Sequence, residues 1–229
     1  MLSGINVVYL LILVAVSLGL IFGLRALQKS VLAELSAALY EENDPARYAE
    51  MLDSRFLFLV MRRSTVALLR LDGALFSGSG DAVWEACGIL DGIRLKQEER
   101  LNWYQKALSF AVTRGDKQNA EIYLTRIDRL LEKEPDESLK AVRADAGRLY
   151  GVYIQRDTSL IAEIEGDVAS LSGTRLGLEL YRLAKLYHYA GDDDKAADAL
   201  KRAAHELKGS PWLEVAGRAL LDPEVLETE

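Results

Sequence analysis

An uncharged apolar segment at the N-terminus constrains this chain more than any other feature. Residues 2–24 contain no Asp, Glu, Lys or Arg, and their apolar part runs from Ile5 to Leu24. As a helix with a rise of 1.5 Å per residue, that part spans roughly 30 Å, the thickness of a bilayer's hydrocarbon core. A cleaved signal peptide is the alternative, but no Lys or Arg precedes the segment and no small-x-small cleavage site follows it. We expect residues 1–29 to form an uncleaved transmembrane anchor with short flanks.

The charges beside this segment predict its orientation. Arg25 and Lys29 follow the span directly, whereas no Lys or Arg precedes it. By the positive-inside rule, the C-terminal part of a single-pass chain then lies in the cytoplasm. The single cysteine, Cys87, is compatible with a reducing compartment.

Small residues recur along one face of the predicted span. Ala15, Gly19 and Gly23 are spaced four residues apart and include a G-x-x-x-G pattern. In lipid, such a stripe lets a second helix approach closely, either in a homodimer or in a larger membrane assembly. The alternative is that glycine is simply common in membrane helices, and both interpretations stay open.

All charged side chains follow the uncharged segment 2–24 and give the rest of the chain an acidic character. Lys and Arg number 28 and Asp and Glu 35, so the net charge is −7. This balance argues against nucleic acid as a general partner, because binding phosphates needs a basic surface. One cysteine and two histidines leave little for a metal site, and no GxSxG, HExxH or Walker pattern is present. We therefore expect no enzymatic activity, no metal and no cofactor.

The sequence after the anchor has helical periodicity and no strand-like alternation. Short turns interrupt it, because Gly closes one helix and Asp or Ser caps the next. Among these turns are Asn43–Pro45, Ser77–Gly80, Gly115–Asp116 and Gly191–Asp192. Loops this short join antiparallel neighbours into hairpins. We expect an all-α domain over 30–221, followed by an acidic, disordered tail over 222–229. The expected helices are 5–42, 45–53, 55–76, 81–93, 97–114, 117–133, 137–154, 158–171, 174–190, 193–208 and 211–220.

Residues 180–203 carry the clearest repeat pattern. Large, small and turn residues recur there at the spacing of a helix–turn–helix unit: Leu180, Leu183, Ala184, Tyr187, Gly191, Ala196, Leu200 and Ala203. The segment resembles the tetratricopeptide repeat (TPR), a unit of 34 residues. Residues 104–127 match the same offsets less well, and the closing proline of the family is displaced to Pro211. The resemblance implies a right-handed superhelix of antiparallel hairpins. An irregular helical bundle is the alternative.

The resemblance also implies a concave groove lined by the first helix of each hairpin. Its groove positions fall on Leu178, Tyr181, Lys185 and His188 in the last repeat, and on Asn102, Gln105, Ser109 and Val112 in the helix 97–114. Aromatic, basic and amide side chains suit an extended peptide, through stacking and hydrogen bonds. The lysine–asparagine clamp by which some family members hold chaperone C-termini is not reproduced. An ordinary solvated face is the alternative.

Four arginines form a stripe on the expected helix 55–76. At 100° per residue, one side of that helix carries Arg55, Arg62, Arg63 and Arg70. Near a membrane, such a stripe can meet anionic lipid headgroups. It can equally pair with acids of the preceding segments, among them Glu41, Glu42, Glu50 and Asp53. We favour the internal pairing.

Two functions follow from these features. The first is a membrane-anchored TPR-like scaffold that binds a protein or peptide partner through its repeat surface, without catalysis. The second is a structural accessory subunit whose transmembrane helix packs into a larger membrane assembly. A repeat fold supplies binding surfaces but does not determine what they bind. The choice between these two functions therefore depends on the residues of the site.

Overall fold

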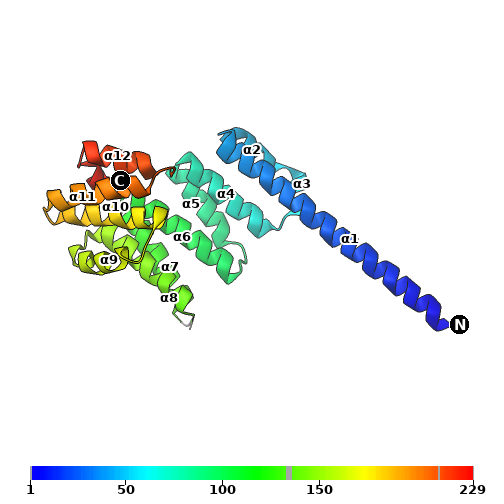
Figure 1. Ribbon diagram of the computed structural model, residues 1–229. Helices are drawn as coiled ribbons and strands as arrows, with labels where there is room; N and C mark the ends of the chain where they lie inside the picture. Colours follow the sequence, from blue (N-terminus) through cyan, green and yellow to red (C-terminus); the bar gives the residue numbers. More distant parts are fainter. Residues whose placement is uncertain (1, 133–135, 211, 229) are drawn as a thin grey trace. The chain divides into compact units, whose positions relative to one another are not determined.

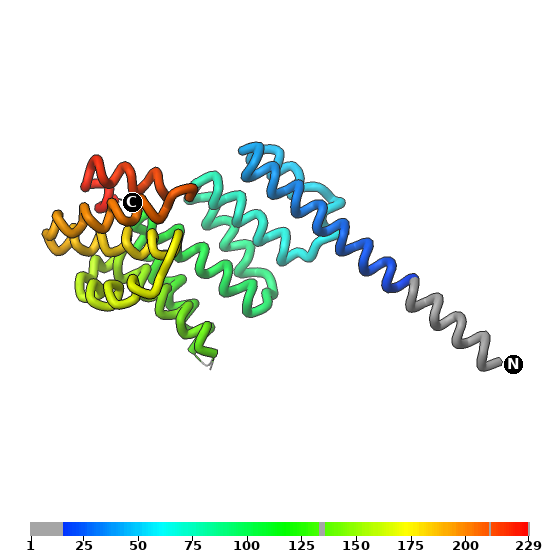
Figure 2. The backbone as a smooth tube through the Cα atoms, viewed as in Figure 1, coloured from blue at the N-terminus to red at the C-terminus, as the bar shows by residue number. Residues whose placement is uncertain are grey.

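The computed structural model describes residues 2–132, 136–210 and 212–228, with side chains from Val16 onward (Figures 1 and 2). These residues are mostly helical and contain no strand, which confirms the all-α class. The chain divides into two compact units, Met1–Lys96 (unit 1) and Gln97–Glu229 (unit 2). The expected division after residue 29, between a membrane anchor and a helical domain, stays a prediction. Leu35 and Leu39, at the end of the long first helix, are buried in the core of unit 1.

Unit 1 begins with one long helix that continues through a π-helical turn. Its elements are α1 (Leu2–Ser36), η1 (Ala37–Glu41), α2 (Pro45–Asp53), α3 (Arg55–Val60), α4 (Arg63–Ser77) and α5 (Gly80–Asp91). Asp44 caps α2 by accepting a hydrogen bond from the Arg47 amide. Gly78 closes α4 with a φ of 67°, and Ser79 caps α5. The predicted turn residues therefore act as expected at these ends.

The part of α1 from Val16 to Leu27 lies outside the core of unit 1. Every residue from Val16 to Leu27 is exposed, including Leu20 at 70% and Phe22 at 64%. Among the residues with described side chains, one helical segment, Val16–Glu41, is long and apolar enough to cross a membrane. Water solvates such a surface poorly.

The expected helix 55–76 is wrong, because the chain breaks it into α3 and α4. Met61 and Arg62 have extended backbones, with ψ near 150° (153° and 147°). The break lets the side chains of Leu57, Val60 and Met61 enter the same core as Val66 on α4. Since no glycine or proline marks this point, the local pattern could not predict it. The four arginines of the predicted stripe consequently do not share one helix.

Unit 2 is a series of hairpins followed by two short C-terminal helices. Its elements are α6 (Gln97–Thr113), α7 (Lys117–Leu131), α8 (Glu137–Tyr150), η2 (Gly151–Gln155), η3 (Thr158–Leu160), α9 (Ile161–Val168), α10 (Gly173–Tyr189), α11 (Asp193–Glu206), α12 (Trp212–Leu221) and α13 (Val225–Thr228). Gly115 and Gly191 close α6 and α10 with φ of 66° and 77°. Asp116 and Asp192 then cap α7 and α11. The predicted Gly–Asp turns are confirmed, whereas Pro211 lies outside the described residues.

Small residues let α10 and α11 approach closely. Ala184, Ala199 and Ala203 are buried between these helices and their neighbours. A Cβ atom added to Gly177 would lie 2.6 Å from Leu207 Cγ, well inside van der Waals contact. The small residues of the repeat pattern thus have a packing role in the last hairpin.

The C-terminal tail corrects the expectation of disorder over 222–229. Residues 225–228 form α13, and Leu226 is fully buried in the core of unit 2. The Tyr189 hydroxyl donates a 3.0 Å hydrogen bond to the Leu226 carbonyl, and the Lys185 ammonium donates to the same oxygen. The acidic composition of the tail gave no sign that Leu226 is buried in this core. Glu229 lies outside the described residues.

Candidate functional site

A cleft of about 260 Å³ opens on unit 2 between α6, α8 and α10. We call it the hairpin groove. It is lined by Gln105, Leu108, Ser109, Thr113, Asp145, Ala146, Leu149, Tyr153, Leu178, Arg182 and Trp212. These helices come first in successive hairpins, so the groove has the composite origin expected of a repeat surface.

The lining residues follow the helical period on each of the three helices. Gln105 and Ser109 lie one turn apart on α6, and Asp145 and Leu149 lie one turn apart on α8. On α10, Leu178 and Arg182 repeat the same spacing. Residues four apart share one helix face. Each of the three helices therefore contributes two side chains of one face to the lining of the groove.

Arg182 carries the positive charge of the hairpin groove. Its guanidinium lies 2.8 Å from a carboxylate oxygen of Asp145 and 2.7 Å from one of Glu179. Burial acts to lower the pKa of Arg182, but the carboxylates of Asp145 and Glu179 outweigh burial and leave that pKa raised. The side chain is thus a permanent cation with its charge largely balanced from within the unit.

A second arginine, Arg148 on α8, extends this charged network to α9. The Arg148 guanidinium lies 2.6 Å from the carboxylates of Glu163 and Asp167 on α9, and 3.6 Å from that of Glu179 on α10. Its side chain is only 13% exposed. Burial acts to lower the pKa of Arg148, but the hydrogen bonds that its guanidinium donates to Glu163 and Asp167 outweigh burial and leave that pKa raised. The network joins α8, α9 and α10. It therefore fixes the positions of α8 and α10, which form two walls of the groove.

The structure brings three of the predicted groove residues together. Gln105, Ser109 and Leu178 all line the hairpin groove. Asn102 is exposed on α6 but does not line it. Sequence reasoning missed Asp145, Leu149 and Arg182; the irregular turn after α8 hid the repeat offsets that would have identified the first two.

Tyr181, Lys185 and Val112 were expected in the groove, and the structure corrects all three. Each is 2% exposed and belongs to the interior of unit 2. The Lys185 ammonium lies 4.9 Å from the centre of the Tyr153 ring and 5.7 Å from that of Tyr189. For Lys185 the reason is the tail, since its ammonium donates a hydrogen bond to the Leu226 carbonyl at α13.

His188 also lies away from the hairpin groove, at the end of α10. Its Nδ1 atom is 3.1 Å from a carboxylate oxygen of Asp193, and its Nε2 atom is 3.7 Å from one of Glu227. Glu227 in turn pairs with Arg156 at 2.9 Å. These contacts hold the tail against α10 and leave His188 no position in the groove.

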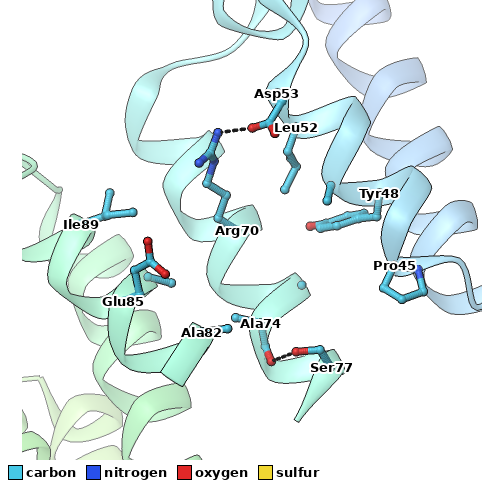
Figure 3. Close-up of a pocket in the computed structure, with 13 residues that line it drawn as sticks. Pro45, Tyr48, Leu52, Asp53, Arg70, Ala74, Ser77, Ala82, Glu85 and Ile89 are labelled. Atoms are coloured by element: carbon cyan, nitrogen blue, oxygen red, sulfur yellow. Dashed lines mark hydrogen bonds and ion pairs between the residues drawn. The ribbon is translucent and has the colours of Figure 1, made fainter. Parts of the chain in front are cut away.

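Unit 1 contains a separate cleft of about 420 Å³ between α2, α4 and α5 (Figure 3). Arg70 and Asp53 face each other at its edge, with 2.6 Å between their charged atoms. The Tyr48 hydroxyl donates a 2.7 Å hydrogen bond to the Leu69 carbonyl. A Cβ at Gly73 would lie 2.7 Å from the Tyr48 ring, so this glycine permits the close approach of α2 and α4. The internal pairing of the arginines is confirmed for Arg70.

The other predicted surface residues are solvent-exposed. Arg55, Arg62 and Arg63 are exposed at the two ends of α3. Gly19 and Gly23 are exposed on α1, with open space where a Cβ would lie. The side chain of Ala15 lies outside the described residues. Packing of this small-residue stripe against another helix stays a prediction.

Among the described residues, no group of three or more His, Cys, Asp and Glu side chains is placed to hold a metal ion.

Comparison of the chain with protein-family models, with curated proteins and with solved structures gave no match. The candidate site therefore rests on its own geometry.

Proposed function

We propose that this chain is a membrane-anchored, TPR-like scaffold that binds a partner protein in the hairpin groove, without catalysing a reaction. The observation that carries the proposal is the lining of that groove. Gln105 on α6, Leu149 on α8 and Leu178 on α10 meet there from three successive hairpins. Composite surfaces of this kind are how stacked helical repeats bind extended partners.

The membrane part of the proposal is supported by α1. Its residues from Val16 to Leu27 are all exposed, and they are almost entirely apolar up to Leu24. A helix satisfies its own backbone hydrogen bonds, so an isolated apolar helix can be accommodated in lipid. Arg25 and Lys29 then stand at the end of the span and favour a cytoplasmic position for the rest of the chain.

The chemistry of the groove favours a peptide segment as the ligand. Gln105, Ser109 and Thr113 offer amide and hydroxyl groups that can hydrogen-bond to a peptide backbone. Leu149 and Leu178 offer apolar contact for one or two side chains. Because Arg182 is already paired with Asp145 and Glu179, the groove does not select strongly for an acidic ligand.

Selection of displayed peptides on the full chain in nanodiscs tests this function. Peptides that bind the hairpin groove should lose about tenfold or more in affinity when Leu178→Asp or Gln105→Ala is introduced, as expected for contacts inside a binding site. The matched controls are Ile122→Asp and Gln118→Ala, one turn apart on α7, where Ile122 is 39% exposed. An equal loss with the control pair would contradict groove binding.

A further inference from the structure

The short helix α3 presents an apolar outer face. Phe56 is 49% exposed, Phe58 47% and Leu59 83%. The inner residues Leu57 and Val60 are buried in the core of unit 1, so α3 is held firmly with its outer face turned away from that core. Three large apolar side chains in four consecutive positions form a patch that water solvates poorly.

A direct hydrogen bond ties this helix to the end of the predicted span. The side-chain amide of Gln28 on α1 donates to the backbone carbonyl of Val60 at 2.7 Å, and α1 and α3 are in contact. Gln28 follows Leu24, the last residue of the apolar run, by four positions, which is roughly 6 Å along a helix. With α1 in a bilayer, that distance puts α3 at the level of the lipid headgroups.

Positive charge surrounds the patch although the chain as a whole is acidic. Arg55 begins α3, and Arg62 and Arg63 follow its end; all three side chains are exposed. Arg25 and Lys29 are exposed on the adjoining part of α1. Aromatic and aliphatic side chains beside arginines are the composition of segments that lie in the membrane interface. Cations next to anionic headgroups add an electrostatic attraction.

We propose that α3 is a second membrane contact: its outer face lies in the interfacial layer of the bilayer, and its flanking arginines bind anionic lipid headgroups. The proposal rests on the proposed anchoring by α1. We identify the bilayer as the surface that covers the patch, because the hydrogen bond between Gln28 and Val60 holds α3 beside the predicted span. This contact fixes the tilt of unit 1 at the membrane surface, which a single helix cannot do alone.

Fluorescent labels at single cysteines test the contact in the full chain, with Cys87 replaced by Ala. The labelled variants are Leu59→Cys on α3, Phe22→Cys in the span and Ile89→Cys on α5, where Ile89 is 43% exposed. The chains are reconstituted in vesicles of phosphatidylcholine and phosphatidylserine. We expect nitroxide-bearing lipids to quench positions 22 and 59 and aqueous iodide to quench position 89.

The three labels separate failure of this inference from failure of the anchor. Lipid quenching at position 22 without quenching at position 59 would overturn the contact and leave the anchor intact. No lipid quenching at position 22 would overturn both. Protection of labelled position 59 from iodide, together with disulfide formation between two unlabelled Leu59→Cys chains, would assign the patch to a second copy and also overturn the proposal.

The arginines are tested by Arg55→Gln and Arg63→Gln in the Leu59→Cys chain. The ratio of membrane-bound to unbound α3, followed by lipid quenching at position 59, should fall roughly fivefold for each cation removed. This is the factor expected for one charge at an anionic surface. In vesicles of phosphatidylcholine alone, the two substitutions should have little effect. Equal effects in both kinds of vesicle would contradict headgroup binding by these arginines.

Discussion

The ammonium of Lys185 donates a hydrogen bond to the backbone carbonyl of Leu226, 41 residues further along the chain. Two rings accompany this contact, since Tyr153 and Tyr189 both lie within cation–π distance of the Lys185 nitrogen. Leu226 fills the core beside them. The C-terminal helix α13 is therefore part of the folded unit 2, and it converts a predicted binding surface into interior.

Replacing Leu226 with Ala should weaken the attachment of α13. The side chain is fully buried, so the loss should be about 2–4 kcal/mol of stability, from lost burial and the cavity left behind. Hydrogen exchange of the α10 amides in the full chain measures the effect. Glu224→Ala, an exposed change in the same segment, serves as control. Unchanged protection in Leu226→Ala would show that α13 does not contribute to the stability of α10.

Gly177 and Gly166 form a matched pair of helical glycines. A Cβ at Gly177 would lie 2.6 Å from Leu207 Cγ, whereas one at Gly166 would meet nothing within 4 Å. Gly177→Ala should destabilise unit 2 by about 1–3 kcal/mol through overpacking. Gly166→Ala should stabilise it by up to about 1 kcal/mol through helix propensity. Denaturant unfolding followed by circular dichroism distinguishes the two signs.

The hydroxyl of Tyr187 donates a hydrogen bond to Glu165. Burial and this hydrogen bond raise the pKa of Tyr187 from 10.0 to about 12. Because the folded pKa lies above the unfolded one, the stabilisation is complete below pH 10.0 and is lost as the pH rises through about 12. Tyr187→Phe should remove this part of the alkaline stability loss. Unfolding curves of both chains between these pH values provide the check.

The turns and helix ends were predictable because local chemistry decides them. Gly191 closes α10 and Asp192 caps α11 where the sequence places them. The break at Met61 was not predictable, since it depends on burial of Leu57 and Val60 against α1 and α2. Local sequence also gives no sign that Gln28 reaches Val60.

The groove was predictable where the repeat offsets hold and not elsewhere. Gln105, Ser109 and Leu178 satisfy the offsets and do line the hairpin groove. Lys185 satisfies them as well, but a segment 41 residues away covers it. Helical periodicity identifies a helix face, whereas the tertiary partner of that face comes from long-range packing.

The most direct test of the scaffold function is photo-cross-linking in cells. A photoreactive residue replaces Ser109 in the hairpin groove of one chain and Gln118 on α7 of another. We predict one discrete partner adduct from position 109, lost when Leu178→Asp is added, and no such adduct from position 118. Adducts of equal yield from both positions, or an adduct from position 109 that survives Leu178→Asp, would contradict partner binding in the groove.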